Sequence, residues 1–194
     1  RDDVKPVSLY RETNVDGAAN TVAAAVANGI SRIVFTSSVA VYGLDEGESV
    51  ETDTPQPFNE YGRTKWAAEG VYRDWESAEG ERHLVIVRPC VIFGEGNRGN
   101  VYTLAKQLKS GFFLTVGDGT NRKSMAYVGN VAEYLAQRIE SVDGPRLVNY
   151  ADKPDLATND LVRVLREAFG KKRGQSVHVP LALGIAGGKV FDAA

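Results

Sequence analysis

The sequence predicts an α/β fold built on a mostly parallel sheet. Segments with a helical spacing of apolar residues alternate with short β-branched runs, which is the pattern that crossover connections between parallel strands produce. The two clearest runs, 32–37 and 84–87, are largely apolar, as expected of strands that are buried on both faces. The chain has 194 residues, enough for one core domain and a small lobe.

Five segments have the spacing and the end residues of helices. Pro6 suits a first turn, the following segment is rich in alanine, and Gly29 is a good stop. Asn130 and Thr158 are predicted to cap the two helices that they precede. The predicted helices cover residues 6–28, 60–78, 101–110, 130–139 and 158–170.

The remaining segments predict short strands and loops. Runs around 125–128, 147–150 and 177–180 are extended, and glycine, proline and acidic residues mark loops at 42–59 and 94–99. Loops lengthen and charge rises after residue 93. We therefore expect residues 1–93 to form one part, and residues 94–194 a mixed lobe with returning sheet elements.

The composition excludes several functions. Apolar residues make up 43% of the chain, charged residues 25%, and the net charge is −2, which gives no electrostatic reason to bind nucleic acid or an anionic membrane surface. No apolar run is long enough to span a membrane. The single cysteine, Cys90, allows no intrachain disulfide and favours a reducing, cytoplasmic setting. His83 and His178 have no partner at metal-ligand spacing, so we expect no metal site.

Three residues predict acid–base chemistry on an alcohol. Ser38 follows the first strand, and ligands of open α/β sheets bind beyond the carboxyl ends of the strands. Tyr61 and Lys65 lie four residues apart, so a helix places them on one face. A free tyrosine has a pKa of about 10, and a nearby ammonium lowers it. Tyr61 can then take a proton from a hydroxyl that Ser38 also contacts, and Lys65 can donate to a cofactor ribose.

Several motifs in order carry a family resemblance. They are Asn14-Val15-Asp16-Gly17, Thr36-Ser37-Ser38-Val39-Ala40-Val41-Tyr42-Gly43, Tyr61-Gly62-Arg63-Thr64-Lys65, Arg88-Pro89, Phe93-Gly94 and Gly117-Asp118-Gly119. Over roughly residues 3–170 the chain resembles the extended short-chain dehydrogenases/reductases, specifically the NAD-dependent epimerase/dehydratase family. The resemblance implies a Rossmann-like, doubly wound parallel sheet, present in part, with a small C-terminal substrate lobe.

The resemblance also implies the roles of individual residues. Ser38, Tyr61 and Lys65 would be catalytic, and Ser37 and Pro89 would join Tyr61 and Lys65 in contacting NAD. Ser38 would also contact the substrate, a nucleotide sugar, whose diphosphate would lie against the residues of the second lobe. These are Asn100, Lys123 where the family usually has an arginine, and the neighbouring Arg122. Relatives often pair, so a homodimer is expected.

Within this family, the sequence favours an epimerase acting at C4 of a UDP-hexose through a transient keto sugar. Dehydratases of the family place Asp-Glu directly after the hydroxyl residue, whereas this chain has Val39-Ala40. Two alternatives stay open at this point. One is an NAD(P)-dependent reductase or dehydrogenase on the same scaffold, and the other is a non-catalytic member of the family.

The family's phosphate-binding turn, Gly-x-x-Gly-x-x-Gly, is not found in the sequence. The run from Gly94 to Gly99 has a similar spacing, but it follows the catalytic helix, where the family has a substrate loop. About two βαβ units are expected on the N-terminal side of Arg1. We therefore predict that the 194-residue chain alone neither binds NAD tightly nor turns over. A calorimetric titration showing micromolar NAD affinity would contradict this prediction.

Overall fold

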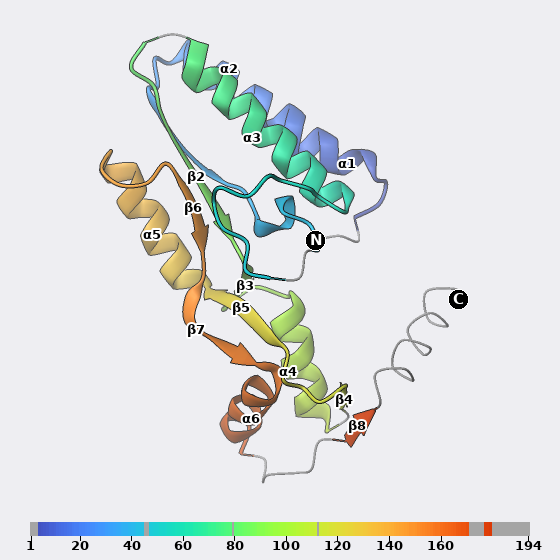
Figure 1. Ribbon diagram of the computed structural model, residues 1–194. Coiled ribbons are helices and arrows are strands. Elements are labelled where there is room, and N and C mark those ends of the chain that lie inside the picture. The colour runs from blue at the N-terminus through green and yellow to red at the C-terminus, as the bar shows by residue number, and fades with distance from the viewer. Residues whose placement is uncertain (1–3, 45–46, 79, 112, 171–176, 180–194) are drawn as a thin grey trace. The chain divides into compact units, whose positions relative to one another are not determined.

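The computed structural model describes residues 4–44, 47–78, 80–111, 113–170 and 177–179 (Figure 1). The chain divides into two compact units. The first comprises Arg1–Gly94 and Ala126–Ala151, and the second comprises Glu95–Met125 and Asp152–Ala194. The chain thus leaves the first unit after Gly94, returns to it at Ala126 and leaves it again after Ala151.

The first unit contains a parallel sheet with the strand order β1-β2-β6. Its strands are β1 (Arg32–Thr36), β2 (His83–Pro89) and β6 (Leu147–Tyr150), and both neighbouring pairs are parallel. Helices α2 (Gly17–Ala27) and α3 (Glu60–Ala78) cover one face, and α5 (Val128–Glu140) covers the other (Figure 1). The predicted α/β class with a parallel sheet is confirmed.

The core of the first unit forms between β2 and the helices α2 and α3. Residues 84–87 of β2 are at most 2% exposed. Of these residues, Leu84 and Ile86 pack with side chains from the two helices, namely Ala18, Ala68, Tyr72 and Trp75. All five residues of β1 are only half-buried, so the prediction of a fully buried strand was right for β2 and wrong for β1. The physical reason is that β1, among the described strands, is paired along one edge only.

The N-terminal helical segment is continuous but changes its winding. The predicted helix over residues 6–28 is divided into α1 (Ser8–Arg11), a π-helical turn η1 (Glu12–Asp16) and α2. A π turn widens the helix and is common at functional positions. Here it contains Asn14, whose side-chain amide donates to the Thr64 hydroxyl of α3 over 2.9 Å. The irregular turn thus connects the first helical segment to the helix that carries Tyr61 and Lys65.

The second unit is built from shorter elements. Strands β5 (Arg122–Tyr127) and β7 (Asp152–Ala157) pair antiparallel, with Arg122 opposite Ala157. Strand β7 was not predicted, because proline and charged residues, such as Pro154 and its neighbours, are uncommon in strands. Strand β4 pairs in parallel with β8. The other elements of this unit are α4 (Asn100–Ser110), β4 (Leu114–Val116), α6 (Thr158–Ala168) and β8 (Val177–Val179). The first unit also contains the short turn η2 (Val39–Val41) and the strand β3 (Val91–Phe93).

Both predicted N-caps were wrong. Helix α5 begins at Val128, so Asn130 lies inside its first turn, and the capping position is taken by Tyr127. Helix α6 begins at Thr158 itself, whose hydroxyl donates to the Asn121 side-chain oxygen over 2.8 Å. In both places a strand runs directly into the helix, which leaves no separate polar residue between them. Among the described helices, none is long and apolar enough to cross a bilayer.

Candidate active site

The carboxyl end of β1 presents two consecutive serines. The backbone N–H of Ser37 donates to Val87 O on β2, and the residue is 3% exposed. Its buried hydroxyl has no hydrogen-bond partner among the described residues. Ser38 has an extended backbone, and its Oγ accepts from the N–H of Ala40 over 3.2 Å. This contact caps the short turn η2, so Ser38 is fixed at the tip of the strand.

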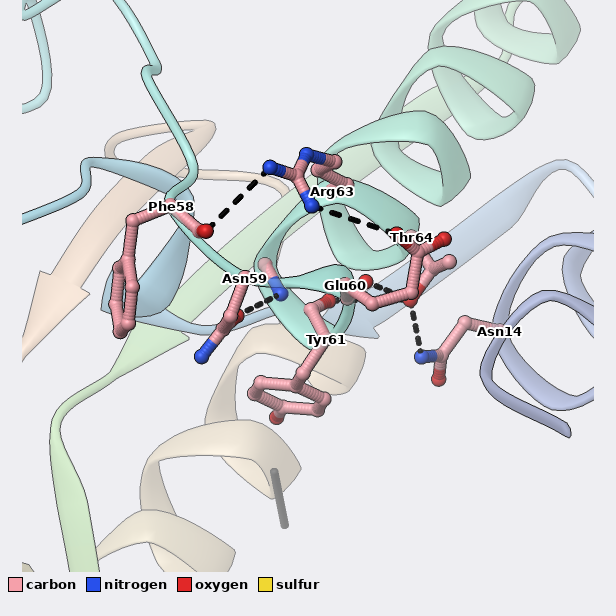
Figure 2. A network of polar contacts seen from close by, with 8 residues as sticks. Asn14, Phe58, Asn59, Glu60, Tyr61, Arg63 and Thr64 are labelled. Carbon is pink, nitrogen blue, oxygen red and sulfur yellow. Dashed lines mark hydrogen bonds and ion pairs between the residues drawn. The ribbon is translucent and has the colours of Figure 1, made fainter. Parts of the chain in front are cut away.

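The start of α3 is fixed by an asparagine cap. Asn59 Oδ1 accepts from the N–H of Gly62 over 2.8 Å, so the helix begins at Glu60 and Tyr61 is its second residue. Figure 2 shows this contact together with Arg63, which reaches back to Phe58 O, while the Tyr61 ring projects away from Arg63. The predicted bounds of this helix, residues 60–78, are confirmed.

Lys65 connects the helix to the strand tip. Its Nζ donates to the Thr36 carbonyl over 2.8 Å and lies 4.5 Å from the centre of the Phe35 ring. Thr36 immediately precedes the two serines. Tyr61 lies one turn before Lys65 on the same face of α3, and its ring centre is 6.3 Å from that of Tyr10. The structure therefore anchors the Lys65 side chain beside the strand end that carries Ser37 and Ser38.

A glycine allows this close approach. A Cβ atom added at Gly62 would lie 2.4 Å from Ala40 O and 2.9 Å from the Pro57 Cβ. Cβ atoms do not come this close to backbone oxygens in folded proteins, so the first turn of α3 can contact η2 only through a residue without a side chain. Because Gly62 follows Tyr61 and Ala40 follows Ser38 by two residues, the same contact sets the distance between the tyrosine and the serine.

We predict that Gly62→Ala forces α3 away from η2. It should lower the free energy of unfolding by about 1–3 kcal/mol, as overpacked sites do, and reduce any activity that needs Tyr61 and Ser38 together. Urea unfolding and rate measurements on the purified protein check both effects. Gly70→Ala is the matched control, because Gly70 lies in the same helix with nothing within 4 Å of an added Cβ. That variant should be more stable by about 0.5–1 kcal/mol.

Two influences on the pKa of Lys65 oppose one another. Burial lowers the pKa of the Lys65 ammonium below its usual range, and the negative charge of Glu69 acts in the opposite direction. Glu69 is fully buried one helical turn further along α3. It forms a two-pronged ion pair with Arg88 of β2, with N···O distances of 2.8 and 2.6 Å.

Arg88 and its partners are the part of the site that sequence reasoning missed. Desolvation lowers the pKa of Arg88, but the hydrogen bonds and charge of Glu69, with the Tyr42 hydroxyl, outweigh it and leave that pKa raised. Arg88 entered the sequence analysis only as part of the motif Arg88-Pro89. The available signal was a carboxylate on the apolar face of a predicted helix, next to Ala68, and a guanidinium inside an apolar strand.

The other predicted site residues lie in different surroundings. Pro89 is the last residue of β2 and is buried, opposite Tyr150 of β6. Asn100 is the first residue of α4 in the second unit and is exposed. Arg122 and Lys123 are exposed neighbours in β5, and Arg122 donates to Asp155 O over 3.0 Å. Consecutive strand residues point to opposite faces, so only one of these two cations can face a ligand on a given side of β5.

No group of three or more potential metal ligands occurs in the described residues.

A parallel sheet whose strand tip and neighbouring helix present Ser38, Tyr61 and Lys65 defines an α/β protein with a candidate acid–base site. Comparison with known proteins supports this class and narrows it. A family model described as the NAD dependent epimerase/dehydratase family matches residues 2–151. The chain belongs to that family.

Two curated relatives and one solved structure illustrate the similarity. The chain is 52% identical over 194 residues to the N-acetyl-alpha-D-glucosaminyl-diphospho-ditrans,octacis-undecaprenol 4-epimerase of Escherichia coli O157:H7, covering 99% of this chain and 58% of that protein. It is 29% identical over 199 residues to the UDP-glucose 4-epimerase of Vibrio cholerae, covering 97% and 58%. The structure of MoeE5 in complex with UDP-glucose and NAD matches with a TM-score of 0.72 and 27% identity, covering 86% and 57%. The chain thus spans 58% of the length of both curated relatives.

Proposed function

We propose that the full-length polypeptide carrying this chain is an NAD-dependent 4-epimerase of a sugar linked through a diphosphate. The observation that carries the proposal is the 52% identity to a 4-epimerase over 99% of the chain. The geometry of Lys65 against the strand tip agrees with it, because its ammonium lies one helical turn from Tyr61. The MoeE5 complex, which holds UDP-glucose and NAD, supports the choice of cofactor.

The residues of the first unit fit one edge of an NAD site. Ser37 offers a buried hydroxyl without a partner, and Lys65 Nζ uses one donor on Thr36 O. Bound NAD would supply the acceptor, and then the donor, of the hydride at C4 of the sugar. Tyr61 accepts the proton of the C4 hydroxyl as a phenolate that the Lys65 ammonium stabilises, and Ser38 donates a hydrogen bond to the same oxygen. Tyr61 gives the proton back when the hydroxyl is restored with the opposite configuration.

The group attached to the diphosphate distinguishes two substrate classes. The relative from Vibrio cholerae is named for a UDP-linked sugar, and the relative from Escherichia coli for a polyprenyl-diphosphate-linked one. UDP-hexoses are the first substrate class that the sequence motifs favour. The higher identity favours an N-acetylhexosamine on a polyprenyl diphosphate, so both belong in the same assay.

The test is incubation of the full-length polypeptide with UDP-glucose, UDP-N-acetylglucosamine and undecaprenyl-diphosphate N-acetylglucosamine, with NAD and without a reductant. Conversion of any of them to its C4 epimer, resolved by NMR or chromatography, supports the proposal and names the carrier. If turnover occurs only when NADH or NADPH is added, the protein is a reductase. If no substrate changes under either condition, the non-catalytic alternative is supported.

A cytoplasmic location and a homodimer are part of the same proposal. The single cysteine favours a reducing compartment, and pairing would use the helical face around Asn28 and the helix that carries Tyr61. Light scattering coupled to size exclusion tests the dimer, because a single peak at the mass of one polypeptide would contradict it. Fluorescence microscopy of a tagged copy tests the location.

A further inference from the structure

Three side chains on successive turns of α3 point in one direction: Tyr61, Lys65 and Glu69. The first two form the candidate site, whereas Glu69 is 0% exposed and is therefore out of reach of a ligand. Both of its oxygens bind Arg88, and Oε2 also accepts from Arg73 over 3.3 Å. A buried carboxylate with this many donors is held in a single position.

The same arginine reaches the segment that follows Ser38. Arg88 Nη1 donates to the Tyr42 hydroxyl over 2.5 Å, and that hydroxyl donates to Asn149 Oδ1 over 2.9 Å. The N–H of Asn149 donates to Glu51 over 2.7 Å, which fixes the loop after η2. Hydrogen bonds therefore connect α3, through Arg88 of β2, to Tyr42 directly after η2, to Asn149 of β6, and to Glu51 in the loop that follows η2.

Stability alone gives a weak reason for this arrangement. Desolvation of a buried ion pair consumes most of the attraction between its charges, and apolar residues of similar volume often fold at least as well. Glu69 and Arg88 lie among apolar residues of α3 and β2, where such a replacement would fit. The feature that apolar residues could not supply is a fixed negative charge one turn from Lys65.

We propose that Glu69, which Arg88 holds in place, is a positioning residue whose fixed negative charge, one turn beyond Lys65 on α3, keeps the Lys65 ammonium charged at the strand tip. This inference rests on the proposed function, in which the Lys65 ammonium stabilises the Tyr61 phenolate. The groups that face Lys65 are Glu69 on its own helix, and the Thr36 carbonyl and the Phe35 ring on β1. The cations behind Glu69 are Arg88 and Arg73.

Loss of the Glu69 charge is expected to lower the pKa of Lys65. Burial lowers the pKa of Lys65, and Glu69 is the charge that limits the decrease. Removal of the carboxylate should therefore let Lys65 lose its proton at lower pH than in the wild-type protein. The alkaline limb of the rate profile should then begin at lower pH, because a smaller fraction of the enzyme holds the protonated Lys65 there.

The experiment replaces both members of the pair, Glu69→Leu with Arg88→Met, so that no unpaired charge remains buried. Arg88 is not among the groups that shift the pKa of Lys65, so the expected direction is the one for loss of Glu69. The matched control is Glu76→Leu with Arg146→Met. This second pair also joins a glutamate of α3 to an arginine outside the helix, with an N···O distance of 2.8 Å. Glu76 lies eleven residues beyond Lys65 and is not among the groups that influence its pKa. For each protein, kcat and KM are measured against pH in the full-length polypeptide. The titration of Lys65 is followed separately by the pH dependence of its acetylation, read by mass spectrometry.

The proposal expects the alkaline limb of kcat and the Lys65 titration both to move to lower pH in the first variant only, with KM unchanged. The proposal is overturned if neither the alkaline limb nor the Lys65 titration moves, or if Lys65 titrates at higher pH. Unfolding would also raise the pKa of Lys65, because it removes the burial that lowers it. The acetylation readout needs no turnover. A shifted Lys65 titration in a protein that epimerises nothing would leave the positioning role standing and reject the proposed function.

Discussion

In the full-length polypeptide, Tyr61→Phe is expected to leave the fold intact and to lower the proposed epimerase activity by at least about 10²-fold. The phenyl ring retains the packing of the half-buried tyrosine near Tyr10, whose ring centre is 6.3 Å away. The lost atom is the oxygen that takes the hydroxyl proton, and general base catalysis by a positioned side chain is worth about 10²–10⁴ in rate. Lys65 and Ser38 remain, but neither replaces the base, because Lys65 is held on Thr36 O and Ser38 on the N–H of Ala40.

Rates of C4 interconversion of wild type and variant, with far-ultraviolet circular dichroism as the check of folding, test this prediction. Tyr72→Phe is the matched control, because Tyr72 lies on the same helix but is 6% exposed in the core, at 4.5 Å from Phe35 between ring centres. It should retain full activity. A Tyr61→Phe protein that epimerises at the wild-type rate would remove Tyr61 from the mechanism.

The elements that were predicted best are those whose ends are marked locally. Helix α3 has its cap at Asn59 and its apolar residues at helical spacing, and β6 is a short apolar run between turns. Strand β1, which precedes Ser38, follows from the same kind of local pattern. The interpretation of residues 36–65 as one site was therefore possible before the contact between Lys65 and Thr36 was known.

The missed features depend on contacts between distant segments. Strand β7 contains Pro154 and charged residues, and only its pairing with β5 makes it a strand. Arg88 has partners 19 and 46 residues away along the chain, so no local pattern reveals them. The π turn around Asn14 is likewise fixed by Thr64, on another helix. Long-range packing overrides local propensity at all three places.

The predicted diphosphate contacts stay predictions for a related reason. Asn100, Arg122 and Lys123 belong to the second unit, whereas Ser38, Tyr61 and Lys65 belong to the first. The local sequence pattern of the second unit does not indicate which of its polar side chains would contact a ligand. Single alanine variants of Arg122 and Lys123, compared for their effect on KM, would show which face of β5 meets the diphosphate.

The largest effect on stability is expected for Arg88→Ala. The truncation leaves the Glu69 carboxylate buried with only the half-exposed Arg73 as a charged partner, and it leaves Tyr42 without its donor. Breaking a buried ion pair from one side costs about 3–5 kcal/mol, so the free energy of unfolding measured with urea should fall by that amount.

Comparing the unfolding free energies of Arg88→Ala and Arg146→Ala shows how much of the loss comes from the burial of the ion pair. Arg146 also binds a glutamate of α3, but its side chain is 59% exposed, and an exposed pair contributes less than about 1 kcal/mol. If both variants lose the same small amount, water reaches Glu69 and the pair is not buried in solution. If Arg88→Ala alone is severely destabilised and the apolar double replacement of Glu69 and Arg88 is not, the cost comes from the stranded charge. The pair would then be retained for its effect on Lys65 and not for folding.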